Sequence, residues 1–361
     1  MRYIILAILT FLLLPSCRKG EVPSSKPGEG DNDNIEEYVP KKIQFSAGLQ
    51  SSIKNNFSSR APLDGTVMPQ GTSVGIIGIY ADVNQDPSNY SLWQLYNGGA
   101  EVHELLENTL YTVIDDEGNL YQDYVPEFPS PASQYNGMSF YAYSPHGAIK
   151  TETVNFTKNC YIETHINSTD MANTTDYLCT KQVIVPTPDN LAPVKLDFFH
   201  VLGRIKFEIF SDRPDINARV NYIEINADCN PDGKLYLETG ECKSKSKHSP
   251  SFPKTYYYRL NNEISSGVHA DFMLYPGTTI YNIKCEISTG EEYENTNIYD
   301  VYPRTGQPQI ELVAGEYTTM TINFSPKEMN LSSDVVEWVG GENQNIGIDE
   351  DSGDVVYEGS N

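Results

Sequence analysis

Apolar and polar residues alternate in short runs along most of this chain. The longest and best patterned run after the N-terminus lies just past the midpoint, over residues 194–210 (VKLDFFHVLGRIKFEIF). Its apolar positions are even-numbered before Gly203, as at Leu196 and Phe198, and odd-numbered after it, as at Phe207. Because strand side chains alternate with period two, this change of parity predicts one long buried strand with a β-bulge or a sharp bend at the glycine.

Shorter runs of the same kind predict strands in the first half of the chain. Helical spacing of Val102, Leu105 and Leu106 predicts one short helix between Gly99 and Asn108. The expected strands of this half lie at residues 42–50, 74–80, 138–143 and 181–186.

The second half shows repeated short strands, nearly every one bounded by Gly, Pro, Asn or Asp, which is the pattern of a β-sandwich. An acidic segment after Trp338 carries two apolar pairs at residues 346–348 and 355–357, and it fits a loose hairpin, a strand offered to a partner or a disordered tail. After the run at 194–210, the expected strands lie at residues 222–227, 234–238, 256–260, 270–275, 280–287, 309–313 and 317–324.

Composition and length support an all-β chain with two domains. The 361 residues exceed what one hydrophobic core usually fills, and 25 tyrosines, 26 glycines and 22 prolines suit short strands and turns. We expect an N-terminal domain over residues 40–190, a C-terminal domain over 191–340 and an acidic tail or donor strand over 341–361. The net charge of −24 argues against nucleic acid as a partner, since a polyanion would be repelled.

The N-terminus predicts export and a lipid anchor. Residues 1–16 contain a short apolar run after Arg2 and are typical of a signal peptide. Leu14-Pro15-Ser16-Cys17 resembles the lipobox of bacterial lipoproteins, which predicts cleavage before Cys17 and acylation of that cysteine. Several acyl chains give stable anchoring to a membrane. Residues 17–39 are rich in Gly, Pro, Ser, Asp, Asn and Glu and predict a flexible tether.

Five cysteines remain after Cys17, an odd number that cannot all pair within one molecule. Cys229 and Cys242 flank a turn and a short strand, so a local disulfide between them is one possibility. The cysteines lack CxxC spacing and the histidines lack HExxH spacing, so we expect no metal and no cofactor.

Three features with catalytic or binding character are better explained by structure. Gly71-Thr72-Ser73-Val74-Gly75 matches the GxSxG pattern of a serine nucleophile, but a strand rather than a helix is expected after it. His200 lies on an apolar strand face and fits a hydrogen-bonded core histidine. Tyr256, Tyr257 and Tyr258 offer a sugar-stacking platform only if alternation does not turn the middle ring to the opposite face.

Several ordered segments together resemble the fimbrillin family, the pilins and accessory subunits of type V fimbriae in Bacteroidales-type bacteria, including Mfa-like lipoproteins. Each segment is short, and their order and spacing carry the resemblance. They are the strand with Phe45, the Ser59-Arg60-Ala61 step, the strand around Gly75, the block at 139–145, the Asp176-Tyr177-Leu178 step, residues 194–209, and Leu312, Gly315, Tyr317 and Trp338 near the end.

The resemblance implies two tandem transthyretin-like β-sandwich domains and a lipoprotein of the outer membrane, displayed on the cell surface or in a fimbrium. It also implies proteolytic processing between Arg60 and Ala61, which would remove the first strand and let a strand of another subunit replace it. The expected function is that of a structural or accessory (tip or anchor) subunit that contributes to adhesion. Its expected partners are other fimbrial subunits, the outer-membrane lipid through acylated Cys17, and a host or bacterial surface receptor.

Two other functions are considered beside this one. An outer-membrane glycan-binding lipoprotein would show an exposed aromatic platform on one face and no cleavage at Arg60. A secreted hydrolase would show a serine or carboxylate constellation in a cleft, and the 49 acidic residues cannot be paired into such a site from sequence. We therefore expect no enzyme.

Overall fold

The computed structural model describes residues 42–50, 67–82, 91–97, 102–128, 135–154, 157–186, 192–211, 213, 217–302, 310–325, 328–337, 346–348 and 355–357. They lie in one compact unit, Pro40–Asn361. Within them the fold is all-β, as predicted, with one short helix, α1 (Leu92–Asn97), and two single turns of 3-10 helix. The predicted signal peptide and tether, Cys17, Arg60 and Ala61 lie outside the described residues.

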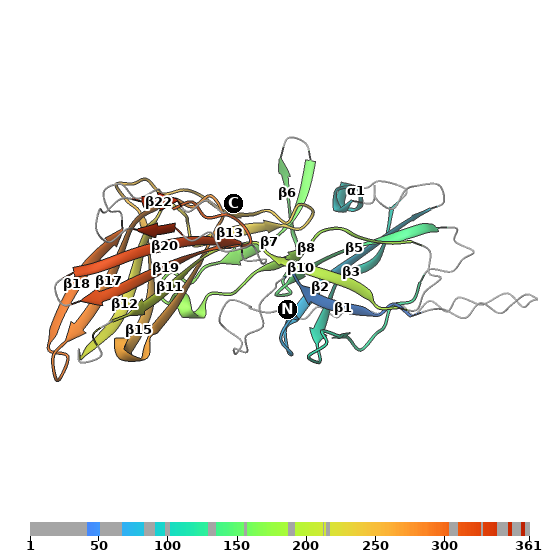
Figure 1. Cartoon of the computed structure of the whole chain (residues 1–361). Coiled ribbons are helices and arrows are strands. Elements are labelled where there is room, and N and C mark those ends of the chain that lie inside the picture. The colour runs from blue at the N-terminus through green and yellow to red at the C-terminus, as the bar shows by residue number, and fades with distance from the viewer. Residues whose placement is uncertain are drawn as a thin grey trace, which may run out of the picture. The chain divides into compact units, whose positions relative to one another are not determined.

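The first half of the chain builds an eight-stranded sheet in the order β1-β10-β8-β5-β2-β3-β4, with β9 pairing β5 beside this path (Figure 1). Its strands are β1 (Phe45–Leu49), β2 (Ser73–Asp82), β3 (Val102–Val113), β4 (Leu120–Tyr121), β5 (Tyr135–Ser144), β8 (Leu178–Thr180), β9 (Val183–Pro186) and β10 (Val194–His200).

The centre of this sheet is buried on both faces, which explains the continuous apolar run of β2. Ile76 packs into one core with β1 and β10, whereas Ile77 packs into the core that continues into the second half. Gly75 is required for close packing, because a Cβ there would lie 2.6 Å from the ring of Tyr143. A strand covered on both faces reads as uninterrupted apolar sequence rather than alternation.

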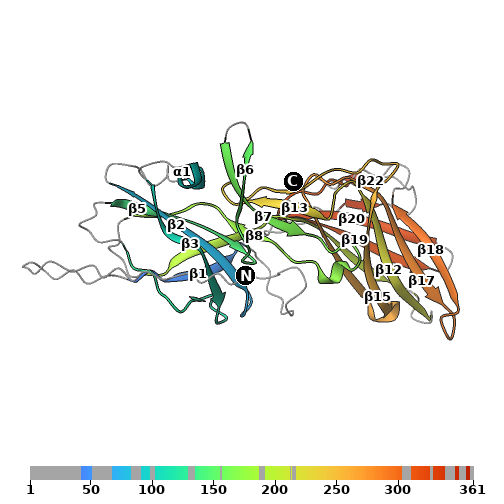
Figure 2. The same cartoon turned by 180° about the vertical axis from the view of Figure 1, so that it is seen from behind.

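The second half forms two four-stranded sheets, β16-β11-β19-β20 and β15-β12-β17-β18 (Figure 2). Their inner faces share one core, in which the rings of Tyr258 and Phe272, one from each sheet, lie 5.8 Å apart. The strands are β11 (Gly203–Phe210), β12 (Ala218–Ala227), β15 (Lys254–Glu263), β16 (Val268–Leu274), β17 (Ile280–Thr289), β18 (Asn295–Tyr302), β19 (Glu316–Ser325) and β20 (Glu328–Glu337).

The run at 194–210 is two strands rather than one. The predicted change of parity is real: Phe198 is buried in β10 and Phe207 in β11. However, β10 pairs with β1 and β8 in the first sheet, whereas β11 pairs with β16 and β19 in the second half. The chain changes sheet between them, at Val201 and Leu202, and a Cβ at Gly203 would lie 2.9 Å from the Leu312 side chain.

Two local predictions are wrong. The segment at Val102 to Leu106 is part of β3 and not a helix, because its pairing with β2 overrides the helical spacing of three apolar residues. The short helix α1 lies earlier, where Leu92 is fully buried. Residues 310–313 form no strand, and Glu311 makes only an isolated bridge with Thr279.

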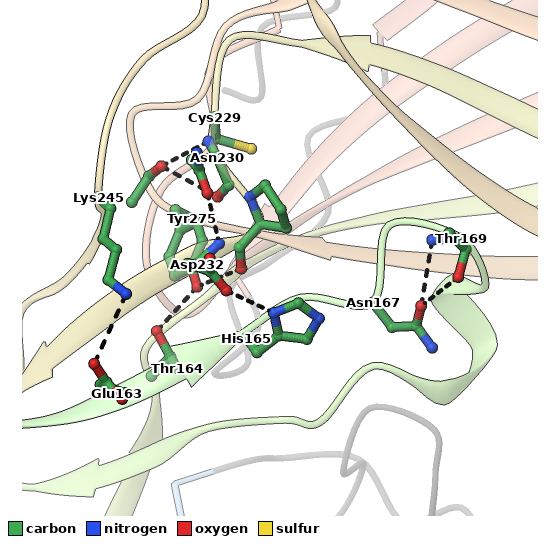
Figure 3. Close-up of polar contacts among 12 residues, drawn as sticks. Glu163, Thr164, His165, Asn167, Thr169, Cys229, Asn230, Asp232, Lys245 and Tyr275 are labelled. Atoms are coloured by element: carbon green, nitrogen blue, oxygen red, sulfur yellow. Dashed lines mark hydrogen bonds and ion pairs between the residues drawn. The ribbon is translucent and has the colours of Figure 1, made fainter.

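A fourth sheet, β14-β13-β7-β6, joins strands from the two halves. Strand β7 of the first half pairs with β13 of the second, from Tyr161↔Tyr236 to His165↔Asp232. Tyr275 lies under this joint, with its hydroxyl 2.9 Å from Thr164 Oγ1 and donating to the carbonyl oxygen of Pro231 at 3.1 Å (Figure 3). The strands are β6 (Lys150–Val154), β7 (Thr157–His165), β13 (Asp232–Tyr236) and β14 (Cys242–Ser244).

The acidic C-terminal segment contains a small hairpin. Strand β21 (Ile346–Ile348) pairs antiparallel with β22 (Val355–Tyr357) in the register Ile346↔Tyr357. Of the three interpretations that the sequence left open for this segment, the structure agrees with the hairpin.

Candidate functional site

Strand β1 and the residues just before it place four apolar side chains in the core of the first sheet. Ile43, Phe45, Ala47 and Leu49 are all buried, whereas the side chains between them are intermediate or exposed. The Phe45 ring makes edge-on contacts with Tyr111 at 5.3 Å and with Phe140 at 5.0 Å between ring centroids. The predicted alternation is confirmed, and β1 is a structural part of the core.

The two edges of β1 are held very differently. On one side it forms a continuous parallel ladder with β10, from Phe45↔Val194 to Leu49↔Phe198. On the other side β1 makes two isolated antiparallel bridges to separate stretches of chain, at Asn119 and Val67, and Lys42 just before the strand makes a third with Glu127. The second edge is thus held by scattered contacts rather than by a neighbouring strand.

A tight turn at residues 115–119 closes the second edge of β1. The Ala47 N–H donates to the carbonyl oxygen of Gly118 at 2.8 Å, and Gly118 itself has a φ of +80°. A Cβ at this position would lie 2.2 Å from the carbonyl oxygen of Ala47. Asp115 stabilises the turn, because its Oδ1 accepts the N–H groups of Glu117 and Asn119. Only glycine fits here, for reasons of both conformation and space.

Next to β1 lies a hollow of about 380 Å³ that sequence reasoning missed. Its walls come from residues 43–45 at the start of β1, from the segment at 111–125 and from Pro193 just before β10, so no single motif marks it. The turn signal Asp115 to Gly118 was present in the sequence and would have located one wall. Among the residues that line the hollow are Gln44, Ile114, Asn119, Leu120, Tyr121 and Gln122.

Ser73 is not placed as a nucleophile. It opens β2, and the chain continues as a strand rather than as a helix, as predicted. Its Oγ accepts the backbone N–H of His146 at 3.2 Å, while Nε2 of the same histidine lies 3.1 Å from the Asn108 carbonyl oxygen. The imidazole therefore faces a backbone carbonyl and does not pair with the serine hydroxyl.

His200 is a core residue, as predicted. Its side chain is 1% exposed, and its Nδ1 lies 3.0 Å from Oδ2 of the equally buried Asp176. Within the described residues no group of three or more His, Cys, Asp or Glu side chains could hold a metal ion.

The tyrosine run at 256–258 alternates between faces, as expected for a strand. Tyr256 is fully buried and donates its hydroxyl to the carbonyl oxygen of Cys229 at 2.8 Å. Tyr257 faces the other way and packs edge-on against Tyr222 at 5.8 Å. Tyr258 contacts Phe272 on the inner side. The three rings therefore do not form one platform.

The five cysteines of the described region are buried thiols. Cys229 and Cys242 are not bonded to each other. Burial raises the pKa of the Cys242 thiol to about 12, so it stays protonated at neutral pH. Such thiols are inert rather than reactive.

The described residues form an all-β fold of several packed sheets. A family model described as fimbrillin-like matches residues 76–338. The chain belongs to the fimbrillin-like family. This is a family of structural fimbrial proteins, so the chain is not an enzyme, and membership implies a place at the cell surface and association with other fimbrial subunits.

Solved structures agree with this fold. A candidate cell adhesion protein from Bacteroides ovatus is 15% identical, with a TM-score of 0.54 over 84% of this chain and 100% of the other. One from Bacteroides uniformis is 14% identical, with a TM-score of 0.52 over 82% and 98%. The tip fimbrial protein Mfa3 from Porphyromonas gingivalis is 10% identical over 83% and 100%, and its TM-score of 0.40 is too low to support an argument. No curated protein matches the chain.

No helix in the described part of the chain is long and apolar enough to cross a membrane.

Proposed function

We propose that this protein is a lipid-anchored structural or accessory subunit, at the tip or the anchor, of a type V fimbrium. In this proposal Cys17 of the unprocessed chain carries the lipid in the outer membrane, and the two halves are tandem transthyretin-like sandwiches. Cleavage between Arg60 and Ala61 frees the subunit from Cys17 and its lipid and removes β1, and a strand from another subunit takes the place of β1. The processed subunit contributes to adhesion through a host or bacterial surface receptor.

The observation that carries this proposal is the position of β1. Together with Ile43 just before it, β1 fills the core of the first sheet with four side chains, yet it has a continuous ladder on one edge only. It also precedes the predicted cleavage step and lies before the segment matched by the family model. A cut at residue 60 would therefore release a strand whose loss exposes β10 and the apolar core beneath it.

The energetics make replacement of β1 necessary after such a cut. Burying Ile43, Phe45 and Leu49 contributes roughly 1.5–3 kcal/mol each. The main-chain bonds of the strand, such as Gln50 N–H to Phe198 O at 2.9 Å, add about 1 kcal/mol each. The sum approaches the whole stability of a domain, about 5–15 kcal/mol. A subunit that loses β1 must gain another strand by β-augmentation to stay folded.

The test is the N-terminus of the native protein. We would isolate the protein from the cell envelope and from sheared surface material and identify its first residue by mass spectrometry. A chain that begins at Ala61 in high-molecular-weight sheared material supports a polymerising subunit. Arg60→Ala should block that cut, whereas Lys54→Ala, a basic residue in the same segment, should not.

A chain that keeps an acylated Cys17 and stays with the membrane in every fraction would contradict processing and strand exchange. The remaining explanations would be an anchor subunit and a glycan-binding lipoprotein. The two are separated by co-isolation, since an anchor subunit purifies with fimbrial subunits after mild crosslinking and a glycan-binding lipoprotein does not.

A further inference from the structure

The hollow beside β1 has the size of a small-ligand site. Its volume of about 380 Å³ lies near the lower end of ligand pockets, about 300–1,000 Å³. It would hold one or two six-membered rings and is too small for a folded segment of protein. The strand-exchange proposal does not use it, and the hollow described here belongs to the chain that still carries residues 43–45, before any cut at Arg60.

The lining of the hollow combines an apolar wall with planar polar groups. Ile114, Leu120 and Val125 supply the apolar surface, and Gln44, Asn119 and Gln122 supply amides. The Asn119 amide donates to Asp115 Oδ2 at 2.8 Å, which fixes its plane. An amide group carries both donors and an acceptor, so it can pair with a hydroxyl in either sense. The matching ligand has one apolar face and several hydroxyl groups at its edge.

Tyr121 adds an aromatic surface at this hollow. Its side chain is 55% exposed, and its hydroxyl donates to Asp123 Oδ1 at 3.2 Å. The strand pairing Thr112↔Tyr121 fixes its backbone. Nearby in sequence, Tyr124 is 73% exposed. A tyrosine ring presents a large amphipathic surface at a low cost in side-chain entropy, and the C–H face of a pyranose stacks well on such a ring.

The charge around the hollow selects against anions. Asp115 lines it, and the Asn119 amide that donates to Asp115 holds the pKa of that carboxyl below its usual value, so it is ionised at neutral pH. Glu117 and Asp123 are exposed close by in sequence, and the chain as a whole carries −24. A sulfated or sialylated glycan would be repelled here.

We propose that the hollow between β1 and β4 binds the neutral end of a glycan, one or two uncharged sugar units, with Tyr121 stacking on a sugar ring. Asn119, Gln122 and Gln44 pair with its hydroxyl groups, and Ile114 and Leu120 contact its apolar face.

The test is direct binding by the full-length chain in detergent to an array of neutral and anionic glycans, followed by calorimetry with the best neutral oligosaccharide. Tyr121→Ala should weaken binding about ten-fold, the worth of one well-placed aromatic contact. Asn119→Asp should weaken it too, because it replaces an amide donor with a further carboxylate beside Asp115. Phe252→Ala is the matched control, since Phe252 is a 77% exposed aromatic in the other half of the chain.

Each outcome decides the proposal. Binding of neutral glycans that depends on Tyr121 and not on Phe252 supports it. Preference for anionic glycans, equal binding by the Tyr121→Ala variant, or no glycan binding at millimolar concentration overturns it. Circular dichroism of each variant, and unchanged protection of the β1 amides from hydrogen exchange, show whether a loss of binding is caused by unfolding.

Discussion

Replacing Phe45 by alanine tests whether β1 is part of the core of the first sheet. The Phe45 side chain is 2% exposed and contacts Tyr111 and Phe140 edge-on. Removing a buried phenylalanine costs about 3–5 kcal/mol, from lost transfer energy and from the cavity that remains. The loss should fall on β1 and its partner β10, because these strands share the ladder that begins at Phe45↔Val194.

Amide hydrogen exchange and urea unfolding together measure this effect. At 3 kcal/mol, the amides of Ala47 and Gln50 should exchange about 100-fold faster if they open locally. Phe207→Ala should destabilise the second half by a similar amount without this local effect, since Phe207 packs on Phe272 there. Phe252→Ala should change stability by less than about 0.5 kcal/mol. A cost below about 1 kcal/mol for Phe45→Ala, with unchanged exchange in β1, would refute the assignment of β1 to the core.

Three further changes probe the surroundings of β1, the joint between the halves and the buried thiols. Gly118→Ala should lower the free energy of unfolding in urea by about 2 kcal/mol or more, because the φ of Gly118 is +80° and the new Cβ would meet the Ala47 carbonyl oxygen. Gly147→Ala is its control and should cost little, because a Cβ at Gly147 would meet open space. Tyr275→Phe should cost about 1–2 kcal/mol by removing the hydroxyl that bonds at the joint, and an unchanged urea midpoint would contradict this. Burial raises the pKa of the Cys285 thiol to about 12, so the folded state favours the protonated thiol, and stability should fall between about pH 9 and pH 12 by up to about 1.4 kcal/mol per pH unit. The Cys285→Ala variant should lose less folding stability than the unmodified protein between pH 9 and pH 10.5. An identical loss of stability in the two proteins would show that the buried thiol is not its cause.

Strands with a clear pattern were predictable from the sequence. At β1 the inward residues Phe45 and Leu49 alternate with polar or small ones, and one face is buried, so the local pattern determines the structure. β2 was predictable for a different reason, since a glycine-containing apolar run of this length is typical of a strand covered on both sides. These elements depend on local sequence, and tertiary contacts reinforce the same choice.

The predictions that failed did so because contacts between residues far apart in the sequence decide the structure there. The spacing of Val102 and Leu106 is helical, yet pairing with β2 makes the segment a strand. The run at 194–210 has the right parity on both sides of Gly203, but nothing local shows that its two parts join different sheets. The pairing of β7 with β13 is likewise set by residues about 70 positions apart, beyond what periodicity can report.

The hollow was also missed because contacts between distant residues form it, although the strand at one of its walls was predicted correctly. In the sequence, Ile43 and Phe45 were recognisable only as core positions of the strand expected at 42–50. Tyr121 was only one of 25 tyrosines. The turn at Gly118 brings them together, because it connects β3 to β4 and bonds to Ala47 of β1. β1 therefore has two consequences in one place: its inward face completes a core, and its end forms part of a surface that depends on its presence. Any strand that replaces β1 must supply side chains at the positions of Ile43, Gln44 and Phe45, or the hollow changes its chemistry.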